Sequence, residues 1–268
     1  MNPALHALSA VHAHASGREL REDEVVVEAP VALLYNGEPF AVMMATPGDL
    51  EDFALGFALS EGIVNDATEF KLVDVVASDE GHALHAAIPQ ARFDALAQRR
   101  RVLEGRSGCG LCGVEQLREA LRPVPRVPVG AAVTLAEVTL AEINAALERL
   151  AGQQPLNARS GGVHAAGFAH GQALLVREDV GRHNALDKLI GAIARAQLAP
   201  SSGFVVITSR ASYEIVHKAA SVGIGLVVAI SAPTDLAIRV ADEAGLTLAA
   251  FARAGALNLY THAGRVRS

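Results

Sequence analysis

The spacing of hydrophobic and polar residues changes along the chain and predicts its elements. Residues 1–22 show no sustained period and mix histidine, serine and charged residues, so we expect a mobile tail there. From Glu24, two apolar runs flank Asn36-Gly37, a dipeptide typical of the tight turn between antiparallel strands. The ordered part of the chain is therefore predicted to begin as a β-hairpin.

Helical spacing follows this hairpin. Apolar residues recur about once per turn in residues 50–63, with acidic residues in the first turn, which predicts a half-buried helix. Apolar runs at residues 70–77 and 82–88 predict two further strands, and residues 92–100 a short helix. We interpret residues 23–130 as an N-terminal domain of mostly antiparallel strands with helices.

The second half of the chain alternates strands with helices. FVVI at residues 204–207 and LVVAI at residues 226–230 are apolar throughout, as is typical of strands covered on both faces. Amphipathic stretches such as residues 183–198 separate the strands. We therefore predict a connecting helix in residues 131–155 and a three-layer α/β domain in residues 156–268, which makes the chain α/β, or α+β overall.

Composition and charge narrow the classes of function. The 268 residues are 51% hydrophobic and 19% charged, as in a packed globular protein. A net charge of −6 offers no basic face, so nucleic acid is not expected as a partner. The longest uncharged run is too short and too polar to span a bilayer, and the N-terminus is a poor secretory signal. We expect a cytoplasmic protein that does not bind a membrane.

The two cysteines, Cys109 and Cys112, are the most informative residues. They lie in RSGCGLCG, where glycines break regular structure before a helical pattern resumes at Val114. A zinc site would need two more ligands and no second cysteine pair exists, so no metal is predicted. Three interpretations remain open: a dithiol redox pair, two structural cysteines, and a carrier thiol.

A carrier thiol suits these surroundings. Sulfur transfer needs a reactive thiolate, access for two partners in turn, and a neighbour that protects or resolves the persulfide. The start of the following helix and a group of arginines would favour the thiolate; the arginines are Arg99, Arg100, Arg101 and Arg106. This chemistry alone does not separate sulfur transfer from dithiol redox.

Four segments now stand out together: RRRVLEGRSGCGLCGVEQL, LVREDVGRHNALDKLIG, TSRASYEIVHKAAS and LYTH. In these residues, and from about Val25 to the C-terminus, the chain resembles the formate dehydrogenase accessory sulfurtransferase family. The resemblance implies a protein that takes sulfur from a cysteine desulfurase as a persulfide. It would pass that sulfur to the bis(molybdopterin guanine dinucleotide) molybdenum cofactor, which formate dehydrogenase requires for activity.

The same resemblance assigns roles to residues. It implies that Cys109 carries the persulfide, that Cys112 is an auxiliary thiol, and that the protein is a homodimer. It also implies a cytidine-deaminase-like fold for the C-terminal domain, without zinc deamination, because the deaminase zinc motif is missing from the sequence. Expected partners are a cysteine desulfurase, formate dehydrogenase, and the molybdenum cofactor or guanine nucleotides.

A cofactor-binding site is predicted from two sources. The resemblance places a cofactor-contacting loop at Phe251, Ala252, Arg253, Ala254, Gly255 and Ala256. Ala254 and Ala256 stand where relatives carry a proline and a basic residue, whereas Arg253 and Gly255 remain suited to phosphates.

Polar residues at predicted strand ends are the second source. Arg182 and His183 follow one strand and Arg210 another, where open α/β sheets bind ligands and helix N-termini attract anions. Asp179 could instead cap the helix, and His164 is a weaker candidate for the same site.

Two other functions remain as alternatives to sulfur transfer. One is a chaperone that binds the molybdenum cofactor without sulfur chemistry, and the other is a dithiol oxidoreductase.

Overall fold

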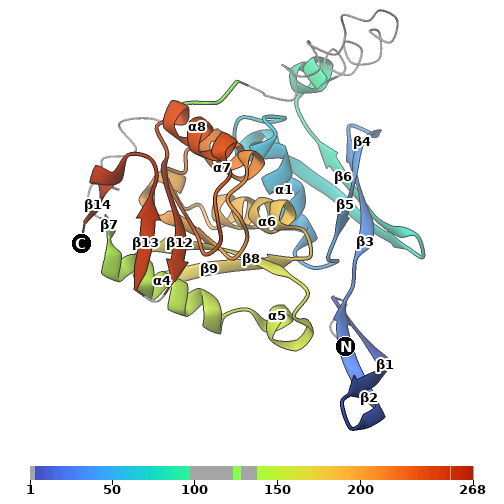
Figure 1. The fold of residues 1–268 in the computed structure, drawn as a ribbon. Helices are drawn as coiled ribbons and strands as arrows, with labels where there is room; N and C mark the ends of the chain where they lie inside the picture. Colours follow the sequence, from blue (N-terminus) through green and yellow to red (C-terminus); the bar gives the residue numbers. More distant parts are fainter. Residues whose placement is uncertain (1–3, 97–122, 128–137, 254, 268) are drawn as a thin grey trace, which may run out of the picture.

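The computed structural model describes residues 4–96, 123–127, 138–253 and 255–267. Within them the chain builds a six-stranded sheet, a four-stranded sheet and two two-stranded sheets (Figure 1). Cys109, Cys112, the neighbouring arginines and Ala254 lie outside the described residues.

The N-terminus forms a long hairpin where we expected a mobile tail. Strands β1 (Leu5–His14) and β2 (Gly17–Val26) pair antiparallel along their whole length, from Leu5 opposite Val26 to His14 opposite Gly17. Most side chains of both strands are exposed. Because neither face is buried, the sequence has no alternation of apolar and polar residues, and the strands could not be recognised from it.

The four-stranded sheet confirms the hairpin and strands predicted for the N-terminal half. Strands β3 (Ala29–Tyr35) and β4 (Glu38–Ala45) are joined at Asn36-Gly37, where both residues have positive φ, as a tight hairpin turn requires. Strands β5 (Lys71–Ser78) and β6 (Gly81–Ala87) complete the order β4-β3-β6-β5, with β3 and β6 parallel. A short 3-10 helix, η1 (Ala67–Glu69), precedes β5, and residues 90–96 are helical.

Helix α1 (Leu50–Ser60) is the predicted helix, but it is buried on almost every side. One face packs on the four-stranded sheet and another on α6 (Arg182–Arg195). The two helices approach so closely that a Cβ atom on Gly56 would lie 1.7 Å from the carbonyl oxygen of Asp187. The expectation of a half-buried helix was wrong, because its small residues and Asp52 face a second helix and not water.

The six-stranded sheet carries the C-terminal half, and its order is β13-β12-β11-β10-β8-β9. Its strands are β8 (His164–His170), β9 (Ala173–Asp179), β10 (Phe204–Ile207), β11 (Leu226–Ala229), β12 (Thr247–Arg253) and β13 (Ala256–Leu259). Strands β10, β11 and β12 are parallel, and β8 runs antiparallel to β10 and to β9. Strands β10 and β11 are buried along their whole length, as predicted.

Helices cover both faces of this sheet, which confirms the three-layer arrangement. Helices α6, α7 (Tyr213–Ser221) and α8 (Asp235–Ala244) share one hydrophobic core with one face of the sheet. Helix α4 (Leu140–Gly152), with a Thr139–Glu142 capping box, packs on the other face. Short elements not predicted are α5 (Pro155–Ser160), the pair β7 (Val138–Thr139) and β14 (Val266–Arg267), η3 (Pro200–Ser202) and η4 (Ala263–Arg265).

Buried charged groups join the two halves. The Lys218 ammonium on α7 lies 3.0 Å from Asp187 of α6 and 2.7 Å from Glu61 at the end of α1. Burial opposes the charge of Lys218, but the two carboxylates outweigh it and raise its pKa. Lys188 is fully buried, 2.7 Å from Asp179 and 2.9 Å from the carbonyl oxygen of Thr46.

Within the described residues, no helix is long and apolar enough to cross a membrane.

Candidate functional site

The predicted cofactor-binding residues that the structure describes gather at one edge of the six-stranded sheet. Strands β9, β10, β11 and β12 all end there, and the antiparallel β8 begins there, with His164 opposite Asp179. Helices α6, α7 and α8 follow the ends of β9, β10 and β11, so their N-termini face the same edge. Figure 1 shows these helices together on one face of the sheet. The expectation that strand ends collect the polar groups is confirmed.

Backbone and side-chain hydrogen bonds hold this edge together. Thr208, directly after β10, binds Ala165 of β8 twice: its N–H donates to the carbonyl oxygen at 3.0 Å, and its Oγ1 accepts from the N–H at 2.9 Å. The N–H of Phe251 donates to the carbonyl oxygen of Ser231, beyond β11, at 3.1 Å. The end of β12, at Phe251, therefore lies along the same edge as the ends of β10 and β11.

His183 lies between the first turns of α6 and α7. Its Nε2 is 2.7 Å from Oε2 of Glu214 and 3.4 Å from Oγ of Ser212, the N-cap residue of α7. Burial lowers the pKa of His183, and Arg182 acts in the same direction, against the opposing pull of Glu214. Burial therefore favours the neutral form of the His183 imidazole over the charged form. Sequence analysis missed Glu214, because an acidic residue in the first turn of a helix is an ordinary feature.

Two arginines at this edge, Arg182 and Arg210, have no ion-pair partner among the described residues. The Nε atom of Arg182 is buried, and no described residue accepts its proton. The guanidinium of Arg210 is exposed, with no hydrogen bond or ion pair to the described residues. Burial, and then Arg182, lower the pKa of His164 on the neighbouring strand. The arrangement suits an anion with several oxygen atoms, because guanidinium groups donate paired hydrogen bonds to such groups.

Glu178 and Asp179, in the same segment as Arg182 and His183, have structural roles. The buried carboxylate of Asp179 accepts hydrogen bonds from the N–H groups of Thr46 and Gly181 and from Asn184, besides pairing with Lys188. Glu178 accepts from the first N–H groups of α5. Asp179 thus fixes the turn that presents Arg182 and His183, and it is not itself available to a ligand.

The segment expected to be a cofactor-contacting loop is mostly strand: Phe251, Ala252 and Arg253 end β12, and Ala256 begins β13. Phe251 has a positive φ of 54° and is 37% exposed, and Arg253 lies opposite Ala256. Gly255 has a φ of 79°, in the left-handed region that favours glycine. Arg253 is exposed, so its guanidinium is free to reach a ligand at this edge.

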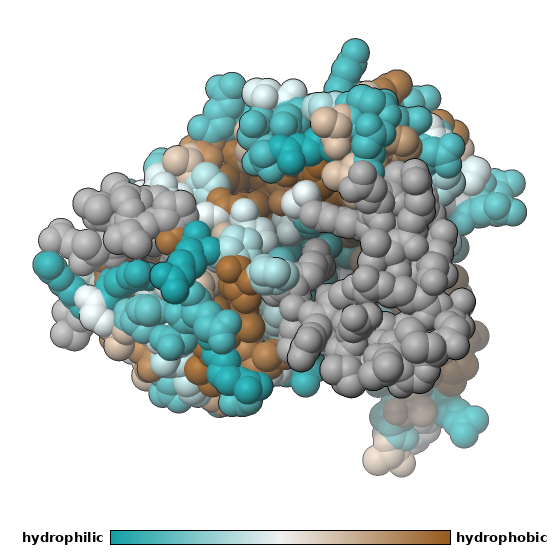
Figure 2. Space-filling view, turned by 90° about the horizontal axis from the view of Figure 1, so that it is seen from above, coloured by the Kyte–Doolittle hydropathy of each residue, from teal (hydrophilic) through white to brown (hydrophobic). Residues whose placement is uncertain are grey.

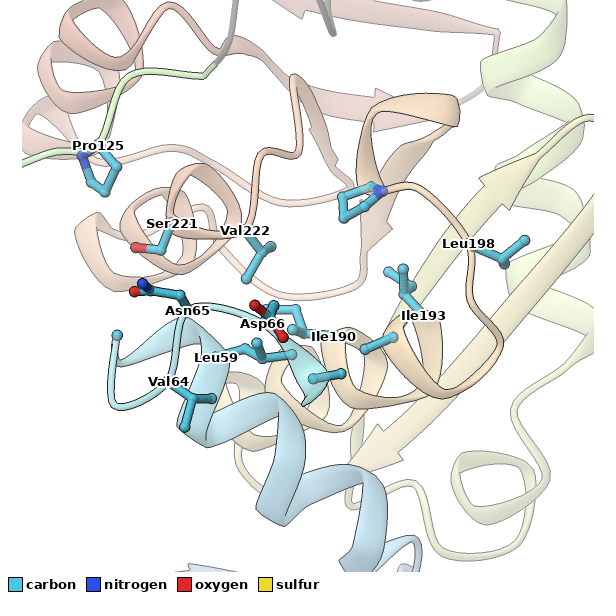
Figure 3. A pocket seen from close by; sticks show the side chains of 14 residues that line it. Leu59, Val64, Asn65, Asp66, Pro125, Ile190, Ile193, Leu198, Ser221 and Val222 are labelled. Carbon is cyan, nitrogen blue, oxygen red and sulfur yellow. The ribbon is translucent and has the colours of Figure 1, made fainter. Parts of the chain in front are cut away.

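A cavity of about 440 Å³ lies elsewhere, near the C-terminal ends of α1, α6 and α7 (Figure 3). Its walls are mainly apolar, including Leu59, Ile190 and Ile193, with Asn65 and Asp66 at the rim. Figure 2 likewise shows hydrophobic residues in a hollow on the upper face of the molecule.

Among the described residues, no group of three or more His, Cys, Asp or Glu side chains is placed to hold a metal.

Comparisons with known proteins extend these findings. A model described as the FdhD/NarQ family matches residues 26–267. The chain is similar to the sulfur carrier protein FdhD of Xanthomonas campestris pv. campestris (strain B100), with 54% identity over 96% of this chain and 90% of that one. It is similar to the protein of the same name from Variovorax paradoxus (strain S110), with 49% identity over 91% of this chain and 87% of that one.

A solved structure shares the fold. The crystal structure of a Desulfotalea psychrophila protein, assigned as a formate dehydrogenase accessory protein, matches with a TM-score of 0.74. The match covers 98% of this chain and 100% of that one at 23% identity. The mixed α/β architecture described above is thus one that an experimental structure also has.

Proposed function

Because this chain belongs to the FdhD/NarQ family, we propose that it accepts sulfur from a cysteine desulfurase as a persulfide on Cys109 and delivers it to the bis(molybdopterin guanine dinucleotide) molybdenum cofactor of formate dehydrogenase. The observation that carries the proposal is the 54% identity, over nearly the whole chain, with relatives named sulfur carrier protein. We further propose that the protein acts as a homodimer.

The loading step is a thiol–persulfide exchange. The Cys109 thiolate attacks the outer sulfur of the desulfurase persulfide, a new S–S bond forms, and the desulfurase cysteine leaves as a thiolate. The exchange involves no net oxidation or reduction, because the outer sulfur atom moves from one cysteine thiolate to another. Cys112, three residues away, is available to protect or resolve the persulfide.

The strand-end edge supports the second half of the proposal. The cofactor carries pyrophosphate groups between its pterin and guanosine ends, and these groups are anionic. Arg182, Arg210 and Arg253 are cationic groups at one edge of the sheet, and the first two have no carboxylate partner among the described residues. Helix N-termini at the same edge add N–H donors. We propose that this edge binds the phosphates and guanine ends of the cofactor.

Sulfur loading is the direct test. We expect the intact mass of the protein to rise by one sulfur atom after incubation with a cysteine desulfurase and cysteine, and the gain to be reversed by a reducing thiol. Cys109→Ser should abolish the gain and should not restore formate dehydrogenase activity in a strain that lacks the protein. Cys112→Ser is the matched control, and it should still load sulfur.

Other outcomes would favour the alternative functions. A protein that binds the cofactor, takes up no sulfur, and supports formate dehydrogenase with Cys109→Ser would be a cofactor chaperone. Turnover of a disulfide substrate that needs both cysteines would indicate a dithiol oxidoreductase.

A further inference from the structure

The hairpin formed by β1 and β2 projects from the body of the molecule, and we call residues 5–26 the N-terminal arm (Figure 1). Among the described strands, β1 and β2 pair only with each other. Contacts at the base fix the arm: the N–H of Val27 donates to the carbonyl oxygen of Ala4 at 2.9 Å, and Glu24 pairs with Arg159 of α5. The family model begins at residue 26, so all of the arm except Val26 precedes the part that matches it.

An arm of this kind needs a further contact to be stable. A two-stranded hairpin alone in water is marginal at best. Leu8, Val11 and Leu20 of the arm are 47%, 60% and 78% exposed. Apart from Phe251 and Tyr260, all large hydrophobic side chains that are exposed in the described residues lie in the arm or in the four-stranded sheet that follows it. The apolar surface is thus concentrated on the N-terminal side of the molecule.

The two edges of the arm differ sharply in charge. Strand β2 carries six charged side chains, which are Arg18, Glu19, Arg21, Glu22, Asp23 and Glu24. Strand β1 reads LHALSAVHAH and has no lysine, arginine, aspartate or glutamate. Charged side chains along an edge strand hinder pairing with another chain, whereas an uncharged edge leaves its N–H and C=O groups open to it. Only the β1 edge therefore favours the addition of a strand.

We propose that β1 of one molecule pairs antiparallel with β1 of a second copy of this chain, so that the two arms form one four-stranded sheet across a two-fold axis. The inference rests on the homodimer of the proposed function and names the surface that forms it. A second copy fits because the same edge satisfies both sides of the pairing and leaves only the charged β2 strands outermost. Small residues at the middle of β1, Ser9 and Ala10, would lie nearest the axis.

The variant Ser9→Lys tests this contact. Ser9 is opposite Glu22 within the hairpin, so the new lysine gains a partner and the arm stays folded. Across the two-fold axis, however, two lysines would meet. We expect the wild-type chain to sediment as a dimer, and Ser9→Lys to raise the dissociation constant of the dimer by at least about tenfold.

Leu20→Lys is the matched control, because it adds the same charge to the outer strand β2 at an exposed position. It should sediment as the wild type does. The proposal is overturned by a wild-type chain that is monomeric at all accessible concentrations, by a dimer that Ser9→Lys leaves intact, or by equal weakening in Leu20→Lys. Circular dichroism should show unchanged secondary structure in each variant.

Failure of this proposal is distinguishable from failure of the proposed function. A dimer that persists in Ser9→Lys removes only the role of the arm. Sulfur loading of Cys109, measured by intact mass on the same variants, reports on the carrier function separately.

Discussion

At the scale of single residues, Arg182 is the side chain on which the proposed anion site depends most. It begins α6, its Nε is buried without a partner in the described residues, and its charge acts on both His164 and His183. GDP carries the guanosine and phosphate groups of the proposed cofactor and serves as the probe for this site. We expect Arg182→Gln to weaken GDP binding by about tenfold or more, because charged hydrogen bonds to phosphate are lost. Isothermal titration calorimetry measures the change.

A surface arginine provides the control for that measurement. Arg239 on α8 is exposed and pairs with Asp235 within its own helix. Arg239→Gln removes the same charge from the molecule and should leave GDP affinity within a factor of about two of the wild type. Equal losses in both variants would mean that overall charge, and not a site at the strand ends, governs binding.

His164 and His183 make the free energy of unfolding depend on pH. Their pKa values are lowered in the folded state, so the unfolded chain takes up protons first as the pH falls below about 6.5. The free energy of unfolding should therefore decrease from pH 7 toward pH 5. His164→Gln should reduce this decrease, as measured by urea unfolding at both pH values; a pH dependence identical to the wild type would contradict it.

At the scale of elements, the contact between α1 and α6 determines how the two halves pack. Gly56 of α1 and Gly191 of α6 face each other's backbones, and a Cβ on Gly191 would lie 1.9 Å from the carbonyl oxygen of Asp52. The atoms in the way are backbone, which cannot move aside without separating the helices. Gly56→Ala should therefore destabilise the protein by about 3 kcal/mol, at the upper end of overpacking effects.

Gly152→Ala is the matched control for the glycine contact. Gly152 ends α4, and a Cβ there would meet no atom within 4 Å. The substitution should be neutral or stabilise the protein by up to about 1 kcal/mol, because alanine favours a helix. Chemical denaturation compares the two variants, and equal effects would show that the contact of Gly56 is not tight in solution.

Secondary-structure elements could be predicted where burial or turn geometry leaves a pattern in the sequence. Strands β10 and β11 are covered on both sides and appear as continuous apolar runs, and the Asn36-Gly37 turn dictates its own geometry. The arm has no buried face and therefore no pattern. The burial of α1 was underestimated because Asp52, which looks like a solvent-exposed helix start, pairs with Arg177 and Arg195.

At the scale of the whole molecule, buried ion pairs join the two halves into one unit. Lys218 reaches Asp187, Glu61 and Ser60, which come from α6 and the end of α1. Lys218→Met would leave Asp187 buried without its partner and should cost about 3–5 kcal/mol. We expect Asp187→Asn to recover part of this loss in the double variant, as measured by urea unfolding. Additive losses would contradict the pairing.

The candidate site illustrates what a sequence can and cannot reveal at this scale. Arg182, His183 and Arg210 were predicted because polar residues follow recognisable strands. Glu214 and the link from Asp179 to Thr46 were not predicted, because they depend on which helix packs beside which. Thr46 and Asp179 are 133 positions apart, and His183 and Glu214 lie on two different helices, so no local pattern in the sequence records either contact.

The contact between α1 and α6 also sets an order of events during synthesis. Thr46 and its partner Lys188 are 142 residues apart, and Asp52 and Arg195 are 143 apart. Until α6 has left the ribosome, α1 has no helix to pack against, and its apolar face stays open. Long-range contacts of this kind slow folding and expose nascent chains to aggregation. Both cysteines thus emerge before the core can close, and a chaperone that shields the first half of the nascent chain would protect them as well.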